Sequence, residues 1–355
     1  MKLREFPEID FLRFLAVFMV VMFHFTARRA DILPYGSYVN GAPWSLGWAG
    51  VQLFFLISGF VISHTLQISK NASEFIIKRV SRIYPALIVI LPIVYLSQKY
   101  IPYSIFQQRS TILNLLGSIT LIPPSALNLI SENQFDWITL VLWSLKVEII
   151  FYIFCALLFI HFGKQRTTLI AKRISLITGI LLLITLNLEN NTSLLLSKVI
   201  VGLGFDYLHW FILGMLIYDR KVNQSRNLLS IFLISFFAIS IDMSKQGISG
   251  NQIALVFVIL LFLLFTVPKK QSRLIKFQVF QICGFSSYEM YLLHQGVGVP
   301  ILYYIIKTLE ISALPAFAVM LLVVIILFYL SYLLSSVTSK LNSRFRIYLL
   351  QNLKI

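Results

Sequence analysis

The chain has 355 residues, of which 58% are hydrophobic and only 12% charged, and its net charge is +16. Its mean hydropathy is +0.84, whereas soluble domains carry about 25% charged residues, so an ordinary soluble protein is excluded. In a bilayer every backbone polar group must be paired internally, which leaves helices or a closed barrel. Barrel strands read as short alternating segments, but the apolar runs here are long and continuous, as in 314–334. The composition therefore predicts an all-α, polytopic membrane helix bundle.

Ten stretches have the length and apolar character of a membrane-spanning helix, which needs about 20 predominantly apolar residues. In chain order the predicted spans are 9–28, 48–68, 83–100, 139–161, 174–188, 199–218, 228–243, 252–267, 280–306 and 314–338. Segment 111–130 is apolar but interrupted by Asn114, Pro123 and Pro124. We expect a re-entrant or interfacial helix there. No linker or repeat separates a second domain, so we expect a single membrane domain over 1–355, without an appended soluble domain.

The basic residues predict the orientation, because Lys and Arg favour cytoplasmic loops. With ten spans and a cytoplasmic N-terminus, 22 of the 30 Lys and Arg residues lie on the inner face, 7 lie on the outer face, and Lys146 lies within a span. An eleventh span at 111–130 would invert every later loop. The asymmetry therefore favours ten spans with both termini in the cytoplasm. It also explains the net charge without nucleic acid as a partner, since inner loops face anionic lipid and anionic cytosolic ligands.

Function is expected from polar side chains within the spans, because such groups are costly in lipid and usually face the bundle interior. In the first span, Arg13 and His24 are eleven residues apart, so they share one helix face about 16 Å apart along the axis. A guanidinium at the cytosolic mouth suits phosphate, and an imidazole farther in suits proton transfer. The alternative is that Arg13 reaches lipid headgroups and His24 bonds to a neighbouring helix.

The densest basic cluster beside a span lies at 78–85, with the sequence Lys-Arg-Val-Ser-Arg-Ile-Tyr-Pro. Arg79 and Arg82 are three residues apart and become neighbours if this segment is helical. One interpretation is a phosphate clamp with fixed bidentate donors. The other is the positive charge that any cytoplasmic loop carries.

The fourth and ninth spans add further polar groups. Glu148 cannot pair with the lysine two positions before it, since residues two apart on a helix point away from each other, so we expect a partner on another helix. Tyr288, Tyr291 and His294 share one face of the ninth span. His24, Glu148, Tyr291 and His294 all fall at middle-to-outer depth. This convergence of two imidazoles, a carboxylate and a phenol is the predicted reaction centre. A zinc site of the two histidines and Glu148 can be imagined, but the spacing is not a metal motif, so we predict no metal.

Five segments together resemble the signatures of the acyltransferase family 3 membrane proteins. Residues 9–24 resemble the Arg, ten residues, His signature, 50–60 resemble GVxLFFxxSGF, and 79–85 resemble Arg-x-x-Arg followed by Tyr-Pro. Residues 143–152 resemble WSLxxE…FY, and 287–294 resemble SYxxYLxH. The five motifs stand in the right order and cover most of the chain. Within 50–60, Ser58 and Gly59 beside aromatic residues are also expected to allow close helix packing.

This resemblance implies transfer of an acyl group, most often acetyl, from cytosolic acyl-CoA to a hydroxyl of an envelope or surface saccharide at the bacterial inner membrane. Acyl-CoA is then a co-substrate, and no bound cofactor is expected. The resemblance carries Arg13, Arg79 and Arg82 over as donor-binding basic residues, His24 as the essential histidine, and Glu148 in a less settled role. Many relatives append a periplasmic SGNH hydrolase-like domain. Here we expect such a partner to be a separate protein, or the transfer to be complete without one.

Our working hypothesis is that His24 acts as general base on the acceptor hydroxyl and that Glu148 orients its imidazole. An acyl-imidazole on His24 is the covalent alternative. A rival function is a transporter or flippase of a lipid-linked saccharide, in which the intramembrane His and Glu form a proton relay. The inverted repeats common in transporters are not recognisable in the sequence. A second rival is an acyltransferase that acts on a lipid or small-molecule acceptor.

Overall fold

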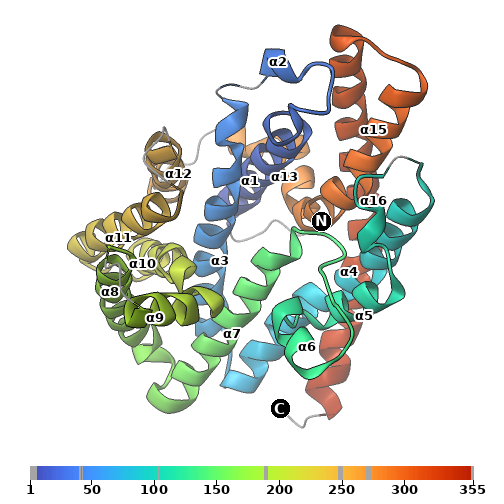
Figure 1. Cartoon of the computed structure of the whole chain (residues 1–355). Coiled ribbons are helices and arrows are strands. Elements are labelled where there is room, and N and C mark those ends of the chain that lie inside the picture. The colour runs from blue at the N-terminus through green and yellow to red at the C-terminus, as the bar shows by residue number, and fades with distance from the viewer. Residues whose placement is uncertain are drawn as a thin grey trace.

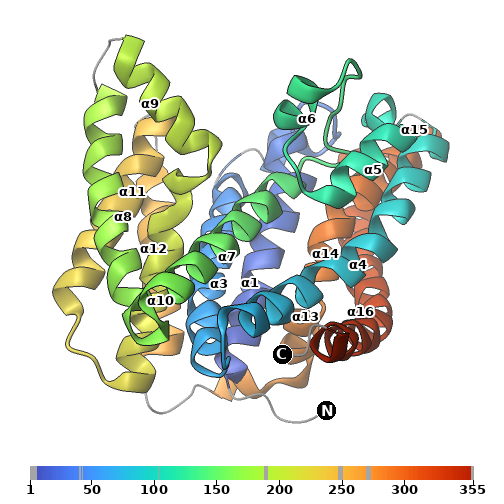
Figure 2. The same cartoon turned by 90° about the horizontal axis from the view of Figure 1, so that it is seen from below.

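The computed structural model describes residues 6–39, 41, 43–102, 104–187, 191–246, 251–268 and 273–352. Within these residues the secondary structure consists of helices and turns, without a strand. The all-α prediction is therefore confirmed for the described part of the chain. Two sets of helices flank a central set, as Figures 1 and 2 show.

The three sets are as follows. The central set is α1 (Pro7–Phe25), α3 (Gly50–Gln67) and α7 (Leu142–Phe162). One flank holds α8 (Lys164–Asn187), α9 (Asn191–Gly202), α10 (Leu208–Asn223), α11 (Leu228–Gln246) and α12 (Asn251–Thr266). The other flank holds α4 (Ala72–Tyr100), α5 (Ile112–Thr120), α6 (Pro124–Ile130), α14 (Ser287–Leu293), α15 (Val299–Thr308) and α16 (Ala313–Asn352). The short helices α2 (Gly36–Val39) and α13 (Gln278–Phe285) complete the set of α-helices, and α13 packs on α1.

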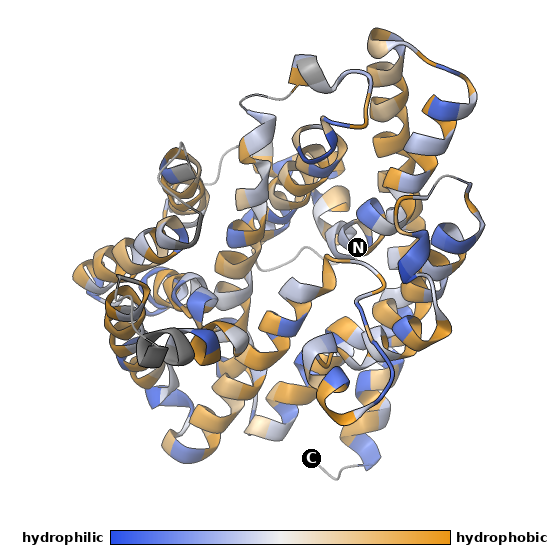
Figure 3. Ribbon diagram, viewed as in Figure 1, coloured by the Kyte–Doolittle hydropathy of each residue, from blue (hydrophilic) through white to orange (hydrophobic). Residues whose placement is uncertain are grey.

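Six helices in the described residues are long and apolar enough to cross a membrane, and a seventh span results if the bent pair α5–α6 is counted as one. The six are Pro7–Arg29, Trp44–Gln67, Ala72–Tyr100, Leu142–Phe162, Lys164–Leu186 and Ala313–Asn352. Figure 3 shows apolar residues along most helices, and many large ones face outward, such as Ile325 and Phe232. A soluble monomer rarely exposes that much contiguous apolar surface. The chain is therefore a multi-pass membrane protein.

The count of ten spans is not confirmed. The predicted span 199–218 is divided between α9 and α10, and 280–306 is broken into α13, α14, a π-helical segment His294–Gly298, and α15. The predicted spans 228–243 and 252–267 correspond to apolar helices shorter than the six. In Figure 2 the start of α1 and the end of α16 lie at the same end of the molecule. That arrangement fits an even number of crossings, and which side of the membrane it faces stays a prediction.

Segment 111–130 folds back on itself, as expected of a re-entrant or interfacial segment. Helices α5 and α6 meet at a bend of 109°. Leu121 ends α5 in the left-handed conformation with φ 57°, and Pro123 and Pro124 follow, where a helix cannot continue. The side chains of Asn114 and Ser118 accept hydrogen bonds from the backbone N–H groups of Asp136 and Ile138. These bonds satisfy backbone groups of the returning loop, as the low-dielectric setting requires.

Helix α4 begins eleven residues before the predicted span at 83. Asn71 caps it, because its side chain accepts a hydrogen bond of 2.8 Å from the backbone N–H of Glu74, and the Glu74 carboxylate accepts one of 2.7 Å from that of Lys70. These two bonds are a local helix-start signal, similar to a capping box, that a hydropathy profile does not register. As a result Arg79 and Arg82 stand on a helix, with the spacing that makes them neighbours.

The expected close approach at Ser58-Gly59 is confirmed. A Cβ on Gly59 of α3 would collide with the carbonyl of Phe211 on α10, and a Cβ on Gly214 of α10 would collide with the carbonyl of Leu56 on α3. Two glycines thus let the backbones of α3 and α10 meet directly, which is the usual means of tight packing between membrane helices. This contact fixes the rotation of α3 and hence the direction in which Ser58 points.

Candidate active site

A cavity lies between α1, α3, α4, α7 and α14. Six of the eight predicted site residues line it: Arg13, Arg79, Arg82, Glu148, Tyr288 and Tyr291. The other two, His24 and His294, are not among its lining residues. The structure therefore gathers the predicted residues from distant segments of the chain but arranges them in two groups. We call the first the acyl cavity and the second the histidine pair.

The Glu148 carboxylate ties three helices together in the acyl cavity. Its Oε1 accepts hydrogen bonds of 2.6 Å from the Ser58 hydroxyl on α3 and of 2.5 Å from the Tyr152 hydroxyl on its own helix α7. The same oxygen lies 3.6 Å from Nη2 of Arg79 on α4. The prediction that Glu148 finds a partner on another helix is confirmed. Hydrogen bonds to a charged acceptor are about twice as strong as neutral ones, so this carboxylate holds its three neighbours in place.

Arg79 is held as tightly as its carboxylate partner. Only 8% of the residue is exposed, and its Nη2 donates a 2.6 Å hydrogen bond to the Tyr152 hydroxyl. Its guanidinium also lies over the Tyr152 ring, 4.7 Å from the centroid, which adds a cation–π attraction. Its Nε has no hydrogen-bond partner in the described structure. The Glu148 carboxylate therefore partly neutralises the positive charge of Arg79. The Nε–H of Arg79 remains available to a ligand.

Two members of this network have no chemical role that the sequence alone indicates. The sequence around Ser58 predicts helix packing, and Tyr152 stands only in a motif. The position of Tyr152, four residues after Glu148, places it on the same helix face, so that contact is readable from spacing alone. Ser58 reaches the carboxylate from a different helix. Its role depends on how α3 is rotated, which no spacing within one segment reveals.

The other two arginines of the cavity differ in their pairing. Arg13 donates from Nη1 to Oδ1 of Asp10 at 2.9 Å, one turn earlier on α1. Arg82 lies over the Tyr288 ring, 5.5 Å from the centroid, and the Tyr288 hydroxyl donates to the carbonyl of Ile83 at 3.2 Å. Among the three arginines, Arg82 alone has no carboxylate within ion-pair distance in the described residues. Its charge is therefore the one most available to an anion.

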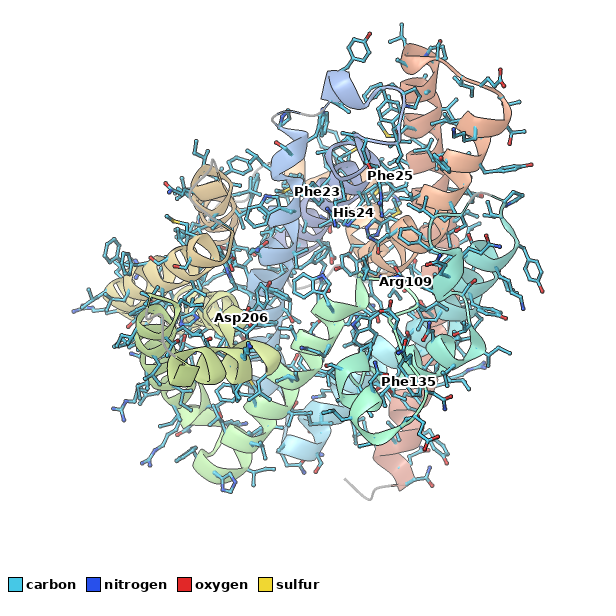
Figure 4. The ribbon with its side chains drawn as sticks, in the orientation of Figure 1. Phe23, His24, Phe25, Arg109, Phe135 and Asp206 are labelled. Carbon is cyan, nitrogen blue, oxygen red and sulfur yellow. The ribbon has the colours of Figure 1, made fainter. Side chains whose placement is uncertain are left out.

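The histidine pair joins α1 to the π-helical segment. Nδ1 of His24 lies 2.9 Å from the carbonyl of Val20, and Nδ1 of His294 lies 2.7 Å from the carbonyl of Tyr291. A carbonyl only accepts, so we assign the proton of each neutral ring to Nδ1. Nε2 of His294 lies 3.4 Å from Nδ1 of His24. Nε2 of His24 then carries the lone pair and is the atom that can accept a proton. Figure 4 shows His24 at the centre of the bundle.

Tyr291 lies between the two groups. Its hydroxyl is 2.8 Å from Oγ of Ser144 and donates at 3.3 Å to the carbonyl of Val141, both at the start of α7. Its ring centroid lies 5.5 Å from that of His294. The same side chain lines the acyl cavity. Tyr291 therefore forms a wall of buried side chain with the cavity on one side and the histidine pair on the other.

The structure does not support the hypothesis that Glu148 orients the imidazole of His24. Glu148 contacts Ser58, Tyr152 and Arg79, whereas backbone carbonyls and the second histidine orient His24. Their similar predicted depth in the membrane indicates one cluster, but the rotation of the helices places Glu148 and His24 in two separate groups. In the described residues, no three or more His, Cys, Asp or Glu side chains stand close enough to hold a metal ion.

Comparisons with known proteins agree with the motifs. A family model described as an acyltransferase domain, of the acyltransferase-3 type, matches residues 6–336. A curated relative, peptidoglycan O-acetyltransferase OatA of Listeria monocytogenes, is 29% identical over 219 residues, which cover 58% of this chain. The match covers 28% of the length of that relative. No solved structure matches the chain significantly.

Proposed function

Since the chain belongs to the acyltransferase-3 family and is therefore an enzyme that transfers acyl groups, we propose that it moves an acetyl or related acyl group from cytosolic acyl-CoA to a hydroxyl of an envelope or surface saccharide. The observation that carries this proposal is the acyl cavity itself. Three arginines line it together with Glu148, and the histidine pair lies behind its Tyr291 wall. A long donor with phosphates at one end and a thioester at the other suits this order of groups.

The donor is proposed to lie with its phosphates at the arginines. Arg82 has no carboxylate partner in the described residues, and Arg79 keeps one unpartnered N–H at Nε. Arg13 completes the set, although its Nη1 is bonded to Asp10. Planar guanidinium groups bind phosphate oxygens with fixed geometry. The pantetheine arm then extends along Glu148 towards Tyr291, which brings the thioester near the histidine pair.

The transfer step is proposed to use His24 as general base. Nε2 of His24 accepts the proton of the acceptor hydroxyl as its oxygen attacks the thioester carbonyl. The carbon–sulfur bond breaks, and the CoA thiolate leaves and takes up the proton from the imidazolium. General-base catalysis typically contributes 10²–10⁴-fold to the rate. His294, whose Nε2 faces Nδ1 of His24, holds the protonated ring in place during the step.

A covalent route through an acyl-imidazole on His24 uses the same lone pair. Rapid mixing with radiolabelled acetyl-CoA in the absence of acceptor distinguishes the routes. Label that stays on the protein, and that is absent from His24→Ala, supports the covalent route. Unlabelled protein under single-turnover conditions supports direct transfer.

The saccharide acceptor is proposed from the relative's name, since OatA is a peptidoglycan O-acetyltransferase. The test is purified protein in lipid nanodiscs with acetyl-CoA and muropeptides or an envelope polysaccharide. We expect CoA release that depends on acceptor and is lost in His24→Ala. Equal CoA release without any saccharide, and no acetylated product by mass spectrometry, would overturn the acceptor class. A separate extracytoplasmic partner that presents the saccharide belongs to the same proposal.

The bacterial cytoplasmic membrane, ten spans and cytoplasmic termini are the proposed setting. The excess of Lys and Arg in the predicted inner loops supports this orientation. The start of α1 and the end of α16 lie on one side (Figure 2), which supports an even number of spans. Single cysteines placed at residues 164 and 132 provide the test, in a background with Cys155 and Cys283 replaced. A membrane-impermeant thiol reagent added to intact cells should label position 132 and spare position 164. Labelling of both, or the reverse pattern, contradicts the topology.

A further inference from the structure

A second polar cavity lies on the other side of α3 from the acyl cavity. It runs between the end of α3, the start of α8 and the end of α10, and its volume is about 560 Å³. It shares no lining residue with the acyl cavity. Helices α8 and α10 belong to the flank that lies away from α14 and α16 (Figure 2). We call it the α8 groove, and its main polar lining residues are Ser63, Gln67, Lys164, Lys172, Tyr218, Asp219 and Asn227.

Two lysines outnumber the one carboxylate that lines the α8 groove, that of Asp219, whose Oδ1 accepts a 2.7 Å hydrogen bond from Nδ2 of Asn223. Lys164, Thr168 and Lys172 follow one another at intervals of four residues, so they line one face of α8. Nζ of Lys164 lies 3.4 Å from the carbonyl of Gln67, and Nζ of Lys172 lies 3.3 Å from the Ser230 hydroxyl. Neither lysine forms an ion pair in the part of the chain that the structure describes. Both ammonium groups thus have weak neutral partners and can turn towards an anion.

Buried polar atoms in the same groove lack partners. Ser63 is 5% exposed, and its hydroxyl has no hydrogen-bond partner. Oδ1 of Asn227 is also buried and unpartnered, although its Nδ2 donates to the carbonyl of Leu216. Buried polar groups are nearly always bonded, so each exception calls for a ligand or an ordered water. A bound hydroxyl group can donate to Asn227 and accept from Ser63.

The remaining wall is apolar. Leu66, Leu169 and Leu216 line the groove, and Leu169 is 41% exposed, so the groove is not closed off from its surroundings. In Figure 2 the turn between α7 and α8 lies at the end of the molecule that also holds the start of α1 and the end of α16. The groove thus combines ammonium groups, hydrogen-bond partners for hydroxyls, and leucines at the end of a membrane helix bundle. Such a lining suits an amphiphile better than a wholly soluble ligand. Basic pockets between membrane helices bind anionic headgroups in this way.

We propose that the α8 groove binds the headgroup of an anionic phospholipid that carries free hydroxyls, of the phosphatidylglycerol type. Its phosphodiester lies between Lys164 and Lys172, its glycerol hydroxyls bond to Ser63 and Asn227, and its acyl chain follows Leu169 towards the bilayer. This site is separate from the acyl cavity. It does not depend on the reaction assigned to that cavity.

The test is lipid retention by native mass spectrometry of the full chain, released from mixed vesicles of phosphatidylglycerol and phosphatidylcholine. Both lipids carry a phosphodiester, but phosphatidylcholine has a cationic headgroup without hydroxyls. We expect one phosphatidylglycerol to be retained in preference to phosphatidylcholine. The double variant Lys164→Gln/Lys172→Gln should bind it about tenfold more weakly, since charged hydrogen bonds are the strong ones. Lys340→Gln, a change of an exposed lysine on α16, is the matched control and should retain it.

Three results would overturn the proposal. Equal retention of the two lipids by the unmodified chain removes the preference for an anionic headgroup, and this result needs no variant. Unchanged retention in the double variant, or in Ser63→Ala, places the lipid elsewhere. Stabilisation by glycerol 3-phosphate at the same concentration as the lipid identifies a soluble phosphate ligand instead. An unchanged unfolding transition in lipid-free detergent shows that a variant is folded, so loss of lipid with an unchanged transition supports the α8 groove.

Discussion

The acyl cavity and the histidine pair are neighbouring polar groups that are built in opposite ways. Glu148 draws its partners from α3, α4 and α7 through charge-assisted bonds. The two histidines instead bond to carbonyls of their own helical segments, Val20 and Tyr291, and meet each other only at 3.4 Å. A network anchored on three helices holds those helices in fixed positions. A pair held by local backbone bonds keeps a ring nitrogen available for proton transfer.

The two regions therefore have different roles. The charged network fixes the shape of the cavity and the position of Arg79. The histidine pair provides the lone pair on Nε2 of His24 that accepts the proton in the proposed transfer step. Tyr291 separates them, with its hydroxyl bonded to Ser144. Mutations should therefore affect catalysis most at the histidines and stability most at the network. Variants in each region test whether these roles are separate.

The largest expected effect is on His24. His24→Ala should lower kcat by about 10²–10⁴-fold, the usual contribution of a general base, with little change in the unfolding transition, because only local contacts are lost. The measurement is steady-state CoA release in nanodiscs. His161→Ala, at the exposed end of α7, is the matched control and should be normal. Retention of more than a third of kcat in His24→Ala would assign the proton transfer to another group.

The next effect is on the stability of the charged network. Glu148→Gln keeps the side-chain shape but leaves Arg79 without its carboxylate. Removing one partner of a fully buried pair costs about 3–5 kcal/mol. Since the Glu148 side chain is 21% exposed, we expect about 1–2 kcal/mol after allowing for solvent screening. The measurement is reversible unfolding, with Glu132→Gln in an exposed loop as control.

Double-mutant cycles test the separation directly. Glu148→Gln with Arg79→Met should show a coupling energy of about 1 kcal/mol or more, because the two side chains share one network. Glu148→Gln with His24→Ala should be additive within about 0.5 kcal/mol, as for residues without shared partners. A coupling of similar size in both cycles would restore the hypothesis that Glu148 orients His24.

A smaller effect is expected at Arg82. Arg82→Lys keeps the charge but loses the planar fork and the stacking on Tyr288, so KM for acetyl-CoA should rise about tenfold, the value of one charged hydrogen bond. The kcat should stay within about a factor of two. Arg346→Lys, on the exposed face of α16, should change neither constant. A fall in kcat with KM unchanged would move Arg82 out of donor binding.

The smallest effect is expected at the wall between the regions. Tyr291→Phe keeps the ring but removes the hydroxyl bonded to Ser144, and should lower the free energy of unfolding by about 0.5–1.5 kcal/mol. Ser144→Ala should cost a similar amount, and the double variant should cost less than the sum, because both remove the same bond. Additive losses would mean that the Tyr291–Ser144 bond does not contribute to the wall.

Much of this arrangement follows from local sequence. Hydropathy over about 20 residues locates α1, α3, α7 and α16, because lipid selects apolar side chains position by position. Helical spacing places Arg79 and Arg82 on neighbouring positions of one helix face, and it excludes Lys146, two residues away, as the partner of Glu148. Even the early start of α4 is encoded locally, in the Asn71 and Glu74 cap. Each of these features depends on neighbours within one or two helical turns.

Tertiary structure alone decided which polar groups meet. Whether Glu148 reaches Ser58 or His24 depends on the rotation of α3, which Gly59 and Gly214 set by backbone contact with α10. The predicted ninth span is not one helix but a broken one, and its π-helical segment places His294 against His24. A hydrogen bond tolerates only a few tenths of an ångström, whereas depth in a membrane is known from sequence to several residues. The sequence therefore determined the spans and the chemical groups, and the packing of the helices determined their partners.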